Sequence, residues 1–185
     1  MFMAAYPPAE VREHFKSMVD SLAVARPRER SVRLHSGERW HLTVAFIGDV
    51  EEPDAAVEAL GELRGTHGPT VRIAGGKTLG RGRFRHLVAQ LESDDLEPLG
   101  TAVRQALKRH RLPYDRRPWQ PHVTIARPGD LLSREELDGD LATLAAYRGP
   151  LWRVDEVRLM RSHLGPKPEY DQLAAVTLDG TAAGR

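Results

Sequence analysis

The chain has 185 residues, of which 29% are charged, and a formal net charge of +1, so bulk charge favours neither a nucleic-acid partner nor an acidic one. It contains no cysteine, which excludes disulfides, thiolate zinc sites and cysteine nucleophiles. Its apolar runs are far shorter than the ~20 residues of a membrane helix, and the N-terminus lacks the pattern of a signal peptide. We therefore expect one cytoplasmic domain over residues 1–185.

The first half of the chain alternates predicted strands and helices. The apolar run Met1–Tyr6, which a Pro-Pro pair ends, predicts an opening strand. Apolar residues then recur every three or four positions over Val11–Leu22, as on the inner face of a helix. The pattern predicts a second strand over Arg39–Ile47 and a second helix over Asp54–Leu63.

The second half adds a hairpin, further helices and further strands. In chain order, the predicted elements are hairpin strands Thr70–Leu79 and Phe84–Leu91, helix Leu96–His110, strand His122–Arg127, a helix after the capping box Ser133–Glu136, and closing strands Leu151–Leu164 and Leu173–Leu178. Hairpins and parallel crossovers are both expected, which predicts a mixed α+β fold. The tail 180–185 is expected to be frayed.

Two of the predicted strands carry the same polar pattern. WHLTVAFIGDV covers Trp40–Val50, and PHVTIARPGDL covers Pro121–Leu131. The histidines in them, His41 and His122, lie 122 − 41 = 81 positions apart, a spacing that fits duplicated half-domains and not a short solenoid repeat. We expect two lobes related by a rough twofold axis, each carrying one His-x-Thr strand.

The two His-Thr pairs suit phosphate ester chemistry. Alternate residues of a strand share a face, so His41 lies beside Thr43, and His122 beside Thr124. Two such faces would form a cleft lined by two imidazoles and two hydroxyls. Imidazole exchanges protons near neutral pH, so one can act as base and the other as acid. Threonine hydroxyls can donate to phosphate oxygens, and this chemistry requires no metal or other cofactor.

The paired motifs HLTVAF and HVTIAR resemble the signatures of the two-histidine phosphoesterase superfamily. Within it, the chain most resembles the bacterial RNA 2′,3′-cyclic phosphodiesterases, long called 2′–5′ RNA ligases. The opening strand with PPAEVREHF, then RWHLTVAFIGDV, RRPWQPHVTIAR and VDEVRLMRSHLGPKPEYDQL, all occur in family order. The resemblance implies an α+β fold in which two pseudo-symmetric lobes, with mainly antiparallel sheets, line a central cleft and helices lie outside.

The resemblance also implies a reaction, the hydrolysis of a 2′,3′-cyclic phosphate to a 2′-phosphomonoester. It assigns the leaving ribose 3′ oxygen to His41 as acid, and the attacking water to His122 as base. The implied substrate contacts are Thr43, Thr124 and Arg127 on the phosphate, and Phe46 under a base. By strict alternation, Arg127 and Phe46 face away from their histidines, so they reach the cleft only if each strand twists or ends there.

Three alternatives to this reaction stay open. The cleft could serve a nucleotide-binding or RNA-binding module with little catalysis. It could also join 2′,3′-cyclic and 5′-hydroxyl RNA ends by the reverse reaction, although water at ~55 M competes unless both ends are held. A histidine-based metallohydrolase is the third. The expected partner is RNA with a cyclic end or a cyclic nucleotide. We expect a monomer by default, since the sequence leaves the oligomeric state open.

Other residues have both functional and structural interpretations. The arginine-rich segment Gly80–Arg85 could hold an RNA backbone or be a solvated hairpin tip. Arg116 and Arg117 could reach substrate, while Trp40 and Trp119 could stack on bases or pack the strand ends. Tyr170 could pack against the end of the cleft. Histidines interpreted as surface or packing groups are His14, His35, His67, His86, His110 and His163.

Overall fold

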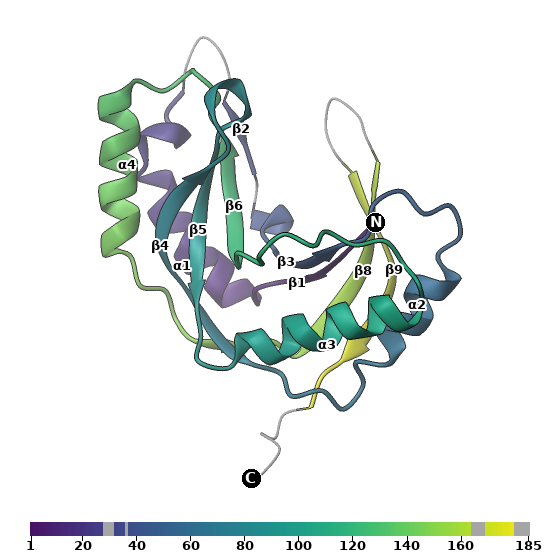
Figure 1. The fold of residues 1–185 in the computed structure, drawn as a ribbon. Coiled ribbons are helices and arrows are strands. Elements are labelled where there is room, and N and C mark those ends of the chain that lie inside the picture. Colours follow the sequence, from purple (N-terminus) through teal and green to yellow (C-terminus); the bar gives the residue numbers. More distant parts are fainter. Residues whose placement is uncertain (28–31, 36, 164–168, 180–185) are drawn as a thin grey trace.

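The computed structural model describes residues 1–27, 32–35, 37–163 and 169–179. Helices lie beside one curled antiparallel sheet, which gives an α+β half-barrel (Figure 1). The predicted tail 180–185 lies outside the described residues.

The sheet runs in the order β7-β4-β5-β6-β3-β1-β8-β9, and β2 pairs with β6 beside this path. The strands are β1 Phe2–Ala5, β2 Arg33–Leu34, β3 Leu42–Phe46, β4 Thr70–Leu79, β5 His86–Glu92, β6 His122–Arg127, β7 Trp152–Arg153, β8 Glu156–His163 and β9 Glu169–Thr177. Each pairing between these strands is antiparallel. The expectation of parallel crossovers was therefore wrong: hairpins and antiparallel returns build the sheet.

Four α-helices in the described ranges pack against the outer side of this sheet. They are α1 Ala9–Asp20, α2 Asp54–Gly61, α3 Leu96–Arg109 and α4 Arg134–Ala146. Helix α4 lies against β4, α3 against β3, and α2 against β8 and β9 (Figure 1). The predicted capping box of α4 is confirmed, because Ser133 and Glu136 each bind the other's backbone N–H. None of the helices in the described ranges is long and apolar enough to cross a membrane.

The closing strands differ from the prediction for a topological reason. The single strand expected over Leu151–Leu164 is two strands: β7 pairs with β4, whereas β8 pairs with β1 and β9. The chain changes neighbours at Val154, whose N–H donates to the Pro69 carbonyl (2.9 Å). Strand β2 was not predicted from the sequence. The predicted strand from Phe84 begins two residues later, at His86, because Gly82–Phe84 forms a short 3₁₀ helix.

Buried apolar side chains lie on both faces of the central strands. The main core fills the space between the sheet and the helices and includes Phe15, Leu42 and Val123. A second, smaller cluster of Phe2, Ala4 and Met160 lies apart from this core. Because strand residues alternate between faces, this smaller cluster marks the opposite, concave face of the sheet, where the candidate site lies.

Candidate active site

The two His-Thr strands meet at a single backbone register point. Strands β3 and β6 pair antiparallel with Leu42 opposite Val123. In an antiparallel pair, the residues on either side of such a point are also opposite one another. His41 therefore lies across from Thr124, and Thr43 lies across from His122. The structure brings these four predicted residues together, and it places each histidine beside the other strand's threonine.

Both catalytic candidates are held in the same tautomer. His41 Nδ1 lies 2.7 Å from the carbonyl oxygen of Arg39, and His122 Nδ1 lies 2.6 Å from that of Gln120. A carbonyl can only accept, so each Nδ1 carries the proton and donates it. In the neutral ring Nε2 is then free to accept a proton, and in the charged ring it can donate one. The backbone thus prepares both rings for proton transfer through the same atom.

Strict alternation along β3 would turn Phe46 away from His41, but a β-bulge brings it back to the same face. Along β1 and β3, Met3 pairs with Ala45 but Ala4 pairs with Thr43, so Val44 is an extra residue. Val44 and Ala45 both belong to the main core. A bulge of one residue reverses the alternation after it, and Phe46 therefore returns to the face of His41. The Phe46 side chain is 53% exposed there.

The equivalent bulge in β6 returns Arg127 to the cleft. Val88 pairs with Thr124, but Leu87 pairs with Ala126, so Ile125 is the extra residue. Ile125 and Ala126 both belong to the main core, as the first pair does. Arg127 therefore shares the face of His122 and Thr124. The strands bulge at the same place in each motif, and this is why a residue five positions after each histidine can serve the same site.

Aromatic rings enclose His41. Its ring centroid lies 5.1 Å from that of Phe2 in a stacked arrangement, 5.4 Å from Tyr6 and 5.8 Å from Tyr170. Burial among these rings lowers the pKa of His41 to about 4, although its hydrogen bond to Arg39 acts the other way. The ring is therefore neutral at pH 7 when nothing is bound.

His122 has a more polar environment. Burial lowers its pKa, the hydrogen bond to the Gln120 carbonyl raises it, and the positive charge of Lys77 lowers it further. Lys77 Nζ donates to Gln120 Oε1 (2.7 Å). Lys77 pairs with Val88, and Val88 pairs with Thr124, so the lysine shares the cleft face two strands away.

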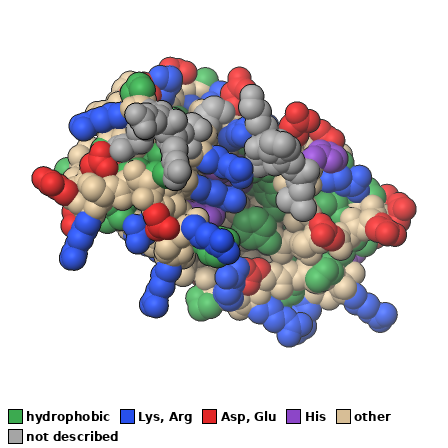
Figure 2. All heavy atoms as spheres, turned by 90° about the horizontal axis from the view of Figure 1, so that it is seen from above, with side chains coloured by type: hydrophobic (Ala, Val, Ile, Leu, Met, Phe, Trp, Pro, Cys, Tyr) green, Lys and Arg blue, Asp and Glu red, His purple; other side chains and the backbone are tan. Residues whose placement is uncertain are grey.

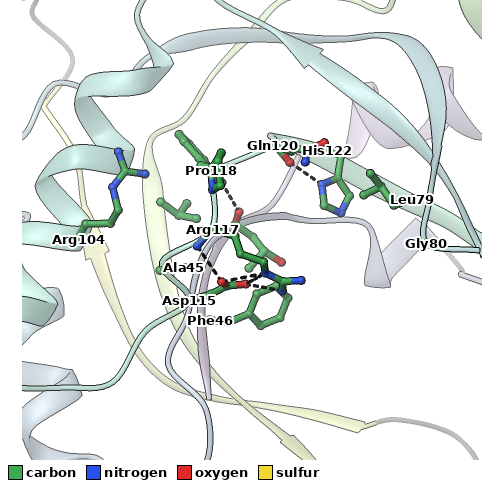
Figure 3. A pocket seen from close by; sticks show the side chains of 13 residues that line it. Ala45, Phe46, Leu79, Gly80, Arg104, Asp115, Arg117, Pro118, Gln120 and His122 are labelled. Atoms are coloured by element: carbon green, nitrogen blue, oxygen red, sulfur yellow. Dashed lines mark hydrogen bonds and ion pairs between the residues drawn. The ribbon is translucent and has the colours of Figure 1, made fainter. Parts of the chain in front are cut away.

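A pocket of about 320 Å³ opens beside His122 and Thr43. Figure 3 shows His122 and Phe46 on two sides of it, with Arg117 held by Asp115. The segment that carries Asp115 and Arg117 is fixed to β3, because the Trp119 indole N–H donates to the Thr43 carbonyl (3.0 Å). The lining combines apolar surface with a few polar groups, as small-molecule sites do.

The two tryptophans near the histidines differ: Trp40 belongs to the buried core, whereas Trp119 is partly buried and lines the pocket. Trp40 is 2% exposed, and its ring lies 4.7 Å from that of Phe15. Trp119 lies so close to Gly100 that a Cβ there would come within 2.5 Å of the indole. Arg117 lines the pocket, whereas the Arg116 guanidinium lies 5.9 Å above the Tyr114 ring.

Sequence reasoning missed several residues on the cleft face. Lys77 has no motif around it, and Phe2 and Tyr6 look like ordinary residues of an apolar strand. His35 and His86 were interpreted as surface or packing groups, but the registers of β2 and β5 place both beside β6. Within the described ranges, no group of three or more His, Cys, Asp or Glu side chains could hold a metal ion.

The chain is similar to known proteins in both sequence and fold. The family model described as the 2′-5′ RNA ligase superfamily matches residues 7–166. An RNA 2′,3′-cyclic phosphodiesterase of Geobacillus stearothermophilus is 32% identical over 155 residues, which cover 80% of this chain and 48% of that protein. The chain therefore spans about half the length of this relative.

Solved structures share the fold over nearly the whole chain. The protein TT0787 of Thermus thermophilus superposes with a TM-score of 0.72 at 25% identity, and the match covers 98% of each chain. E. coli LigT complexed with 3′-AMP gives a TM-score of 0.68 at 22% identity over 96% of each chain. Together with the match of the family model, which covers most of the sequence, these findings show that the chain belongs to the 2′-5′ RNA ligase superfamily.

Proposed function

We propose that the protein is a metal-independent phosphodiesterase that hydrolyses the 2′,3′-cyclic phosphate of RNA ends or nucleotides to a 2′-phosphomonoester. The observation that carries the proposal is the pair of imidazoles with identical tautomers, each opposite the other strand's threonine. The named activity of the Geobacillus stearothermophilus relative supports the same class of substrate.

The proposed step transfers two protons. His122 Nε2 takes a proton from water as the water oxygen attacks phosphorus. The bond between phosphorus and the 3′ oxygen breaks, and His41 Nε2–H gives its proton to that oxygen. The products are a 2′-phosphate and a free 3′-hydroxyl. Solvent then restores the proton to His41 and removes the one from His122.

Fixed donors balance the developing charge. Thr43 and Thr124 donate hydroxyl protons to the non-bridging oxygens, and the planar guanidinium of Arg127 can bind two phosphate oxygens at once. Phe46 offers an exposed ring on which a base can stack. In this scheme the phosphate lies between the two strands at the Leu42–Val123 register point.

Binding of the anionic substrate favours the protonated form of His41, which is the form that acts as general acid. Burial keeps His41 neutral in the empty cleft, and a nearby negative charge favours the protonated imidazole. His41 thus gains its proton when the phosphate binds. The Tyr6 hydroxyl stays protonated throughout, because burial raises the pKa of Tyr6 to about 12.

The proposal is tested by His41→Asn and His122→Asn, assayed for hydrolysis of adenosine 2′,3′-cyclic phosphate with excess EDTA. Each substitution should lower kcat by about 10²–10⁴, while thermal melting shows that the fold persists. His14→Asn, on the exposed outer surface of α1, is the matched control. Wild-type turnover in either cleft variant would overturn the two-histidine mechanism.

A further inference from the structure

The C-terminal half of β6, which ends at Arg127, lies between two histidines that the proposed chemistry does not use. On one side, β5 pairs with Leu87 opposite Ala126, so the next pair along brings His86 beside Arg127. On the other side, β2 pairs with Arg33 opposite Arg127, and the backbone N–H of His35 donates to the Ile125 carbonyl (2.8 Å). Alternation along β5 and β2 puts both imidazoles on the face of Arg127, which is the cleft face.

Within the described residues, no acidic group acts on either imidazole. The ionisable groups that act on His35 are Arg127, His41, Arg39 and His86. Those that act on His86 are Arg127 and His122. All of them are basic, and within the described part of the chain Arg127 forms no ion pair. A cluster of cations and imidazoles without a carboxylate is unfavourable when empty and favourable around an anion.

The imidazoles also have free hydrogen-bonding atoms. The Nδ1 atom of His35 is buried and has no hydrogen-bond partner among the residues that the structure describes. No side-chain hydrogen bond is made by His86 within the described ranges. Buried polar atoms are nearly always paired, and a ligand bound in this cluster would give the Nδ1 atom a partner. Burial is the main cause that lowers the pKa of both imidazoles, and a bound anion would raise it.

We propose that His35, His86 and Arg127 form a second phosphate subsite, which takes the phosphate attached to the 5′ oxygen of the terminal nucleoside. The inference rests on the proposed function, since the cyclic phosphate is assumed to lie between His41 and His122. An RNA chain with a cyclic end continues from that 5′ oxygen, so its next phosphate must lie one nucleoside away on the same face. The five donors of the arginine allow it to contact both phosphates.

The basic surface continues beyond this subsite. The turn that carries Arg81 and Arg83 packs against the residues just after β6. A Cβ added to Gly129 would lie 3.5 Å from the Arg83 carbonyl oxygen. Phe84 in the same turn is 67% exposed, with the Arg83 guanidinium 4.8 Å above its ring. Lys and Arg side chains gather with histidine in the middle of the face seen in Figure 2. Arginines with an exposed aromatic ring are typical of surfaces that bind single-stranded RNA.

Binding of two non-reacting ligands tests the subsite without any need for turnover. The ligands are adenosine 2′-phosphate and adenosine 2′,5′-bisphosphate, measured by calorimetry at pH 6. The wild-type protein should bind the bisphosphate about tenfold more tightly or better, as expected for charge-assisted hydrogen bonds. His35→Asn and His86→Asn should each reduce this advantage, and the double variant should remove it, while the affinity for the 2′-phosphate stays unchanged.

The controls separate this inference from the proposed function. His14→Asn should keep the full advantage, and thermal melting should show that all variants are folded. Equal affinities of the wild-type protein for the two ligands would overturn the subsite, and so would an advantage that survives in the double variant. Equal loss of affinity for both ligands would also overturn it, because the histidines would then support the first phosphate site. Failure of hydrolysis alone would refute the proposed function and leave this result standing.

Discussion

His41 and His122 donate the same ring proton, from Nδ1, to the carbonyl oxygen of the residue two positions before each of them. The strands that carry them, β3 and β6, pair antiparallel with Leu42 opposite Val123. The repeat of the His-x-Thr motif therefore extends to the tautomer of the two rings. Equivalent tautomers make the two imidazoles chemically interchangeable, and their surroundings must then determine which one acts as acid. His41 lies among aromatic rings, whereas His122 lies near Lys77.

The first prediction concerns the pH dependence of hydrolysis. The pKa of His41 is lowered to about 4 and that of His122 is lowered from 6.5, both chiefly by burial. The active free enzyme needs one charged and one neutral imidazole, so kcat/KM should be bell-shaped with both limbs below pH 6.5. It should fall as pH rises above this range, because His41 is then neutral. A flat profile between pH 5 and 8 would contradict paired proton transfer.

The second prediction concerns Lys77. Its charge lowers the pKa of His122, so Lys77→Gln should raise that pKa, as measured from the imidazole C–H proton by NMR. A higher pKa leaves less neutral His122 to act as base near pH 6, and kcat/KM should fall. Lys108→Gln, on the exposed side of α3, is the matched control. An unchanged His122 titration would show that the lysine does not act on the ring.

The third prediction tests the bulge that returns Arg127 to the cleft. Arg127→Lys should raise KM for a cyclic nucleotide about tenfold, because an ammonium group cannot replace the two parallel hydrogen bonds of a guanidinium. The effect on kcat should be smaller. Arg134→Lys, a solvent-exposed change on α4, should alter neither constant. Unchanged kinetics for Arg127→Lys would place its side chain outside the site.

The fourth prediction concerns a buried carboxylate that supports the fold. Asp140 is 3% exposed and accepts hydrogen bonds from the N–H groups of Ala23 (2.6 Å) and Val24 (2.9 Å), which ties α4 to the segment after α1. Asp140→Ala should lower the free energy of unfolding by about 2–4 kcal/mol. Asp138→Ala, exposed on the same helix, should change it by less than about 0.5 kcal/mol. Chemical denaturation measures both, and equal stabilities would contradict a structural role for Asp140.

The sequence predicted the elements around the site well because their patterns are local. Strands Thr70–Leu79 and His122–Arg127 have the predicted bounds, and the capping box marks the start of α4. The repeated His-x-Thr pattern also identified the residues that the structure brings together at the junction of β3 and β6.

The remaining features of the site depend on register, which the sequence does not encode locally. Val44-Ala45 and Ile125-Ala126 are apolar pairs like many others, and only the pairing with neighbouring strands reveals them as bulges. Lys77 lies on β4, two strands from β6 in the sheet, and its charge acts on His122 from there. His35 and His86 likewise meet only because β2 and β5 flank the same strand.

The most direct measurement of the central claim is phosphorus NMR of the purified protein with adenosine 2′,3′-cyclic phosphate and excess EDTA. The account predicts conversion to the 2′-phosphate alone, with the bond to the 3′ oxygen broken. Formation of the 3′-phosphate would contradict the role given to His41. No conversion of this nucleotide or of a short RNA with a cyclic end would contradict the proposed hydrolysis and would favour the alternative of a nucleotide-binding module.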